Sequence, residues 1–193
     1  TGLKFGKTYA NERARIARAE ADPRYAHEQH LAALRALLAK AHHGSPFYRE
    51  LIDRAFGPGF DASTAMPADL RRLPVLGKDQ LSEAGETALA VPRWQLDKTE
   101  TSGSNLAPPF IFFLDKDRSP REMGFIYDVW SRIGFGERDA RVSLRGFHLQ
   151  EGGTGLYDWD PALRELKLAV FPMTTEDVAS YLDEIDRRKI RFL

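Results

Sequence analysis

One short segment of the sequence combines the residue types that can bind a polyphosphate. Residues 99–108 (TETSGSNLAP) concentrate hydroxyl groups and a single glycine between two more apolar stretches. Consecutive small residues allow several backbone N–H groups to turn towards one anion, and Ser and Thr hydroxyls add further donors. The lysine that ends a Walker loop is missing, and one glycine is too few for a dinucleotide-binding fingerprint. The residue types alone leave two interpretations open: a phosphate-binding loop or an ordinary surface loop.

The residues after this segment predict the elements that would position it. Residues 110–114 (FIFFL) are a continuous apolar run, which predicts a strand covered on both faces. A helix is expected over 118–133, short strands over 141–144 and 166–171, and a helix beginning at Thr174 or Thr175. We expect the inner face of that last helix to carry Val178, Leu182 and Ile185. This alternation predicts an α/β subdomain of the βαβ type over residues 96–193.

The first 95 residues follow a different pattern and predict a helical N-terminal region. A charged helix is expected to end at Asp22-Pro23, and an amphipathic helix to follow over 27–43. Gly44 is expected to end that helix as the residue after its C-cap. Ser45 and Pro46 then have the types preferred at the N-cap and first position of a new helix. The predicted organisation is therefore 1–95 helical and 96–193 α/β.

The last four residues (IRFL) are typical of a strand that is beginning, and no partner follows them. A βαβ arrangement should continue beyond such a strand, so we expect the sequence to be truncated here. An unpaired sheet edge and an exposed apolar face would favour self-association, which predicts a homo-oligomer.

Composition excludes several classes of function. Lys plus Arg equal Asp plus Glu at 28 each, which argues against a nucleic-acid-binding protein. There is no cysteine, so thiolate catalysis, disulfides and Cys-ligated zinc are excluded. The five histidines have no metal-ligand spacing, and no metal-binding residue is predicted. No apolar run approaches the ~20 residues that a membrane span needs, so a cytoplasmic location is expected.

The segment 101–104, followed by Pro108 and an apolar strand, resembles the phosphate loop of the adenylate-forming (AMP-binding) enzymes, whose pattern is Thr-Ser-Gly-Ser/Thr-Thr-Gly-x-Pro. Residues 37–49 (LLAKAHHGSPFYR) and 73–81 (LPVLGKDQL) are similar to the phenylacetate-CoA ligase-like branch of that superfamily. The segments 114–116, 142–146, 157–161 and 179–185 resemble its capsular polysaccharide biosynthesis group in particular. The resemblance runs in sequence order over most of residues 27–193.

This resemblance implies an ATP-dependent ligase that activates a carboxylic acid as an acyl-adenylate, which CoA or another acceptor then attacks. It assigns the β- and γ-phosphates of ATP, bridged by Mg²⁺, to Thr101, Ser102, Gly103, Ser104 and Asn105, the last in the place of the family's second Thr. The family's adenine, ribose and C-terminal lysine motifs are absent from these 193 residues. No catalytic residue is assigned, and the chain is not expected to adenylate a substrate alone.

The loop also departs from the family pattern. Leu106 stands where the family has its second glycine. A left-handed conformation there would cost roughly 1 kcal/mol or more relative to glycine. The alternative hypothesis is therefore a catalytically degenerate family member that acts as an interaction or binding module.

Overall fold

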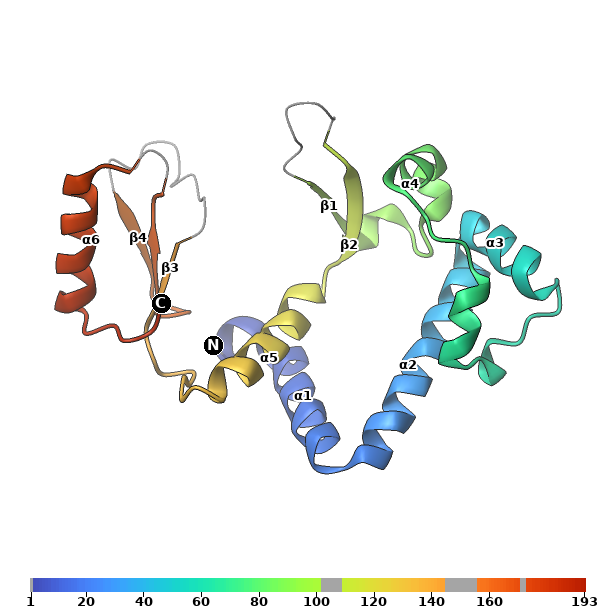
Figure 1. The fold of residues 1–193 in the computed structure, drawn as a ribbon, viewed down its shortest axis with the longest axis horizontal. Coiled ribbons are helices and arrows are strands. Elements are labelled where there is room, and N and C mark those ends of the chain that lie inside the picture. The colour runs from blue at the N-terminus through green and yellow to red at the C-terminus, as the bar shows by residue number, and fades with distance from the viewer. Residues whose placement is uncertain (1, 102–108, 145–155, 171–172) are drawn as a thin grey trace. The chain divides into compact units, whose positions relative to one another are not determined.

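The computed structural model describes residues 2–101, 109–144, 156–170 and 173–193 (Figure 1). The chain forms two compact units. The terminal unit comprises Thr1–Ile16 and Ser119–Leu193, and the middle unit comprises Ala17–Arg118. Both helices and small sheets are present, as the predicted α/β class requires. The predicted boundary after residue 95 stays a prediction, since these units divide the chain by its contacts.

Capping residues mark the boundaries between the first three helices, although the helix predicted over 27–43 begins earlier, at Pro23. Helix α1 (Gly2–Ala21) ends before Asp22, whose side chain accepts hydrogen bonds from two amides of helix α2 (Pro23–Gly44). Ser45 is the N-cap of helix α3 (Pro46–Phe56), and its Oγ accepts the Tyr48 amide at 3.1 Å. Each cap satisfies an amide that the helix itself leaves without a partner. The predicted roles of Ser45 and Pro46 are confirmed.

Gly44 ends α2 for a reason other than the one expected. It is the last residue of the helix and Ser45 is the C-cap, so Gly44 does not occupy the left-handed position after a cap. A Cβ at Gly44 would instead lie 2.3 Å from the carbonyl oxygen of Ala90. Next to it, the buried Ser45 hydroxyl donates to the Thr87 carbonyl at 2.8 Å. Close backbone approach is therefore what requires glycine here.

The rest of the middle unit consists of short helical turns and a hairpin, and a small core joins α2 and α3 to the turn at η1. The turns are η1 (Ala62–Thr64), η2 (Pro67–Arg72), α4 (Lys78–Ala84), η3 (Gly85–Ala88) and η4 (Arg93–Gln95). The core consists of Leu34, Leu38, Ile52, Ala62 and Ala65. Strands β1 (Leu96–Glu100) and β2 (Ile111–Asp115) pair antiparallel, with Glu100 opposite Ile111. The apolar run at 110–114 is thus a strand, but in a partly exposed two-stranded sheet and not one covered on both faces.

The terminal unit contains a mixed three-stranded sheet in the order β3-β5-β4. Strand β3 (Arg141–Ser143) is parallel to β5 (Glu165–Leu168), and β4 (Tyr157–Asp160) is antiparallel to β5. Helix α6 (Thr175–Arg187) follows β5, after which Phe192 forms a parallel bridge with Arg141. The last residues pair with an earlier strand, because they return beside β3; the expected truncation after Leu193 stays a prediction. The chain thus passes from β5 through α6 to a single parallel bridge at Phe192.

Helix α6 covers one face of this sheet, but with different residues from those expected. Thr174 is its N-cap and forms a capping box with Asp177, as predicted. Tyr181 packs in a cluster with Val142, Leu166 and Leu168, and Ile185 contacts that cluster. Leu182, expected on the inner face, is 57% exposed, and Glu184 is 5% exposed. The predicted inner face is therefore only partly correct.

Helix α5 (Arg118–Ser131) lies in the predicted position, and its aromatic residues meet those of α1. Tyr9, Tyr127 and Phe135 form a buried cluster. The Tyr9 hydroxyl donates to Glu137 at 2.7 Å. Burial, followed by that hydrogen bond, raises the pKa of Tyr9 above its usual range. None of the described helices combines the length and apolarity that crossing a membrane would demand.

Candidate functional site

The hydroxyl-rich segment connects the two strands of the β1–β2 hairpin. Thr101 follows β1 directly, and its amide donates to the Phe110 carbonyl at 3.0 Å. In return the Phe110 amide donates to Thr101 Oγ1, also at 3.0 Å. These reciprocal bonds close the hairpin at the point where the loop begins. Ser102, Gly103, Ser104 and Asn105, like Leu106, lie outside the described residues.

This geometry narrows what Thr101 can contribute. Its amide already has a carbonyl partner, so that amide is not a free donor for an anion. Its hydroxyl oxygen accepts one hydrogen bond, but the hydroxyl hydrogen can still be donated, because a hydroxyl both donates and accepts. Thr101 therefore anchors the start of the loop and retains one donor for a ligand.

A cavity of about 830 Å³ lies beside this hairpin end, within the middle unit. Thr101, Lys98 and Arg93 line it together with the aromatic residues of β2. Arg93 pairs with Glu86 at 2.9 Å. Among the described residues, no ion pair involves Lys98. Glu86 is the one acid among the described residues that line the cavity, so their charges sum to a net positive value, which favours an anion.

The hairpin also presents an aromatic surface near the loop. The rings of Phe110 and Phe112 lie 5.8 Å apart with their planes inclined by 11°. Both rings are partly exposed and line the same cavity as Thr101. A flat conjugated ligand could stack on such a surface.

A second cavity in the middle unit is almost entirely apolar. Its volume is about 680 Å³, and it shares Tyr48, Leu89 and Phe113 with the cavity beside the hairpin end. Leucine and valine side chains dominate its lining, and several of them, including Leu37 and Val75, are exposed at its rim. The two cavities thus meet at a common wall.

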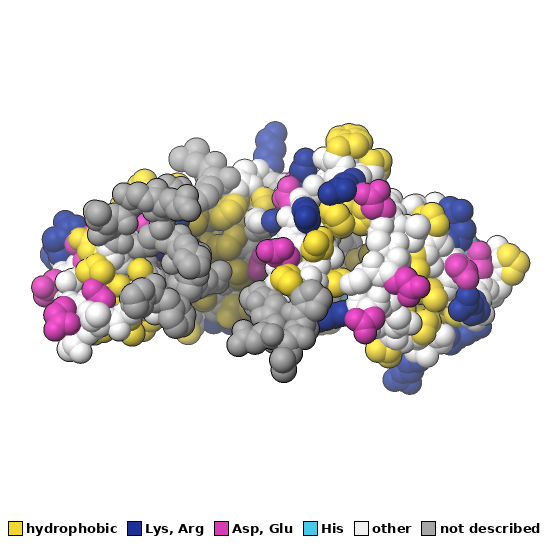
Figure 2. All heavy atoms as spheres, turned by 90° about the horizontal axis from the view of Figure 1, so that it is seen from above, with side chains coloured by type: hydrophobic (Ala, Val, Ile, Leu, Met, Phe, Trp, Pro, Cys, Tyr) yellow, Lys and Arg dark blue, Asp and Glu magenta, His cyan; other side chains and the backbone are white. Residues whose placement is uncertain are grey.

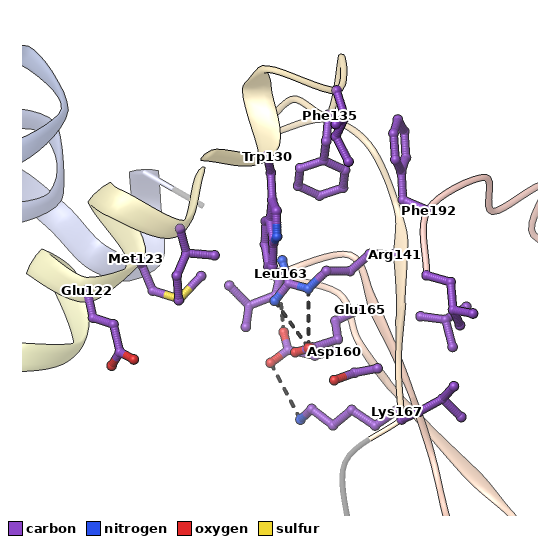
Figure 3. Close-up of a pocket in the computed structure, with 16 residues that line it drawn as sticks. Glu122, Met123, Trp130, Phe135, Arg141, Asp160, Leu163, Glu165, Lys167 and Phe192 are labelled. Atoms are coloured by element: carbon purple, nitrogen blue, oxygen red, sulfur yellow. Dashed lines mark hydrogen bonds and ion pairs between the residues drawn. The ribbon is translucent and has the colours of Figure 1, made fainter. Parts of the chain in front are cut away.

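The terminal unit contains a third cavity, of about 510 Å³, with a charged floor (Figure 3). Arg141 and Glu165 are opposite each other on β3 and β5, and each is only 8% exposed. The Arg141 Nη2 lies 3.2 Å from Glu165 Oε1, and Nη1 donates to the Tyr127 hydroxyl at 3.0 Å. The guanidinium also lies 4.8 Å from the ring centroid of Trp130.

This buried pair was not predicted from the sequence. Arg141 was recognised only as the start of a strand, and Glu165 precedes the predicted strand at 166–171. The pairing depends on the register between β3 and β5, which are separated by more than twenty positions in the chain. A charged residue at the start of each of two short apolar strands was the only signal available.

A further buried acid lies on α6. Glu184 accepts hydrogen bonds from Arg187 and Arg188, and Arg188 lies 4.3 Å from the ring centroid of Trp159. The hydrogen bond from Arg187, partly opposed by burial, lowers the pKa of Glu184 to about 2. Glu184 is therefore ionised at neutral pH and serves the packing of the helix end.

No group of three or more His, Asp or Glu side chains gathers into a metal site within the described part of the chain. His42 Nε2 lies 2.8 Å from Asp53 Oδ1, and His43 Nδ1 lies 2.8 Å from the Ala39 carbonyl, so both rings have local partners. Figure 2 shows acidic and basic side chains interspersed over the face it presents.

The chain matches no protein-family model, and no curated protein matches it either.

Proposed function

We propose that this chain is the N-terminal part of an ATP-dependent adenylate-forming enzyme that activates a carboxylic acid, with CoA or another nucleophile as acceptor. The observation that supports it most is the position of Thr101, the first residue of the proposed phosphate loop. Thr101 lies at a hairpin end that reciprocal hydrogen bonds hold in place, beside a cavity with two cations and stacked aromatic rings. Loops fixed by a rigid scaffold are common places for ligand-binding groups.

Each described group has a role under this proposal. Lys98 and Arg93 offset the negative charge of the triphosphate and of the pyrophosphate that leaves. The Thr101 hydroxyl donates one hydrogen bond at the start of the loop. The Phe110–Phe112 surface stacks on the base. Mg²⁺, when bound, would be held chiefly by the phosphate oxygens and would screen their charge.

Nucleotide titration tests this proposal. We expect the chain to bind ATP with Mg²⁺, and the variant Lys98→Gln to bind it about tenfold more weakly, because one charge-assisted contact is lost. The matched control is Lys78→Gln, an exposed lysine of the same unit outside the cavity. Equal ATP affinity in both variants would contradict the role of the cavity.

The reaction itself is tested by ATP–pyrophosphate exchange in the parent protein over a panel of carboxylic acids. Exchange that depends on one class of acid is the expected result. If no acid supports exchange and the protein does not bind ATP, the proposal is contradicted.

A second candidate is a non-catalytic interaction module of the same family. The exposed apolar rim of the second cavity, where Leu37 is 64% exposed, favours it. Replacing Leu106 with Gly separates the two candidates. If the unaltered chain does not bind ATP and the Leu106→Gly variant does, the loop with Leu106 has lost nucleotide binding, and the interaction module is the better proposal.

A further inference from the structure

The cavity of the terminal unit lies between helix α5 and the open face of the sheet. Met123, Ile126 and Trp130 of α5 form one apolar wall, and Phe135 and Phe192 contribute aromatic rings (Figure 3). Its volume of about 510 Å³ is within the ~300–1,000 Å³ range of small-molecule sites. None of these groups takes part in the proposed nucleotide site, which belongs to the other unit.

The sheet provides a charged floor because side chains alternate along β5. Leu166 and Leu168 point to the face that α6 covers, whereas Glu165 and Lys167 point into the cavity. Arg141 from β3 and Asp160 from β4 complete the floor. Two cations and two anions therefore line it, with no net charge, and Glu122 adds one carboxylate from α5.

Two groups on this floor are left with unused hydrogen-bonding capacity. The Lys167 Nζ lies 3.7 Å from Asp158 and 3.8 Å from Asp160, which is too far for hydrogen bonds. Glu165 meets Arg141 through Oε1 alone, and within the described residues no hydrogen bond reaches its Oε2. Among the described residues no buried side-chain nitrogen or oxygen lacks a partner, so Glu165 Oε2 is open to the cavity, as is the partly exposed Lys167 Nζ. An acceptor and a donor therefore lie on one strand where a ligand can reach both.

We propose that this cavity binds a free α-amino acid with an apolar side chain. Its carboxylate would accept from Lys167 Nζ, its ammonium would donate to Glu165 Oε2, and its side chain would lie against Trp130 and the wall of α5. Lys167 and Glu165 are two residues apart on one strand, about 6.6 Å along it, so a ligand with opposite charges on neighbouring groups can reach both. Because the lining holds both cations and carboxylates, it offers a partner to each charge of a ligand that carries both.

Arg141 is a positioning residue in this arrangement. Its guanidinium is held by the Tyr127 hydroxyl and the Trp130 ring, and it fixes Glu165 through Oε1. The second carboxylate oxygen is thereby left available to the ligand.

Calorimetric titration of the chain with three matched compounds tests the proposal. We expect L-phenylalanine to bind, and 3-phenylpropionate and phenethylamine, each lacking one charged group, to bind at least tenfold more weakly. A site whose buried groups pair with a ligand rejects the analogue that leaves one of them unpaired. Equal binding of all three compounds, or no saturable binding of L-phenylalanine, would overturn the proposal.

Two variants assign the binding to this cavity. Lys167→Met should lose at least tenfold in affinity for L-phenylalanine while keeping the unfolding temperature, since its ion pairs are long. Glu165→Gln should weaken binding of the ammonium, but it also disturbs Arg141, so Lys167→Met is the decisive variant. Lys78→Met in the middle unit is the control and should bind normally. Unchanged affinity in Lys167→Met would show that the charges only hold the sheet together.

Discussion

The cavity beside the hairpin and the cavity of the terminal unit use charge in opposite ways. In the first, Arg93 and Lys98 are exposed and the lining carries net positive charge. In the second, Arg141 and Glu165 are buried and neutralise each other. Exposed cations attract an anion at little cost to folding, whereas a buried pair must be held in good geometry to offset its desolvation. A charge of the first site can therefore be removed with little loss of stability, whereas neither member of the Arg141–Glu165 pair at the second site can be.

The largest effect on stability is expected when one member of the buried Arg141–Glu165 pair is removed. Arg141→Leu leaves Glu165 as an uncompensated buried charge, and we expect a loss of about 3–5 kcal/mol in the free energy of unfolding. Urea denaturation followed by circular dichroism measures it. The double variant Arg141→Leu/Glu165→Leu should recover most of that loss. If the single variant loses less than the double one, the buried pair does not carry the stability assigned to it.

A smaller loss is expected from Gly44→Ala. The new Cβ would lie 2.3 Å from the Ala90 carbonyl oxygen, so the backbone that lines the apolar cavity must shift. Such overpacking costs about 2–3 kcal/mol, which thermal unfolding can detect. The control is Gly59→Ala, because no atom lies within 4 Å of a Cβ built there. Equal unfolding temperatures for the two variants would contradict the close approach.

Glu184 is a second buried charge, and its contribution to stability is expected to depend on pH. Because the pKa of Glu184 is lowered from 4.5 to about 2, its stabilising contribution is present above pH 4.5 and disappears as pH falls towards 2. We expect Glu184→Gln to lower the free energy of unfolding by about 1–2 kcal/mol at pH 6. At pH 3 the free energies of unfolding of the variant and of the unaltered chain should differ by less. A difference that stays constant between these pH values would rule out the ionised carboxylate as its cause.

The smallest effect on folding is expected at the exposed cations. Arg93→Ala removes a surface ion pair, and the free energy of unfolding should change by less than about 1 kcal/mol. If the proposed nucleotide site is correct, the same variant should bind ATP more weakly, and increasing salt should reduce the difference. A stability loss as large as that of Arg141→Leu would remove the contrast between the two sites.

Local chemistry explains which features could be predicted. Ser45, Pro46 and Thr174 were placed correctly because a cap depends on residues within one turn. The buried side of α6 was predicted only at Ile185, because it is a stripe that also contains Tyr181 and the charged Glu184 and Arg188. Hydrophobic periodicity cannot find such a stripe. The charged cavity floor was equally hidden, since strand register brings its residues together.

The bridge at Phe192 affects which edge of the sheet in the terminal unit is open to pairing with another chain. It gives β3 a hydrogen-bonded neighbour on each side, β5 and Phe192, whereas β4 lies at the other end of the order β3-β5-β4. That strand carries Asp158 and Asp160, and an incoming chain that paired with it would have to approach both carboxylates. Acidic side chains on an outer strand discourage fibril-like stacking. We therefore expect copies of this protein to associate through a surface other than β4, and not to aggregate by pairing along this strand.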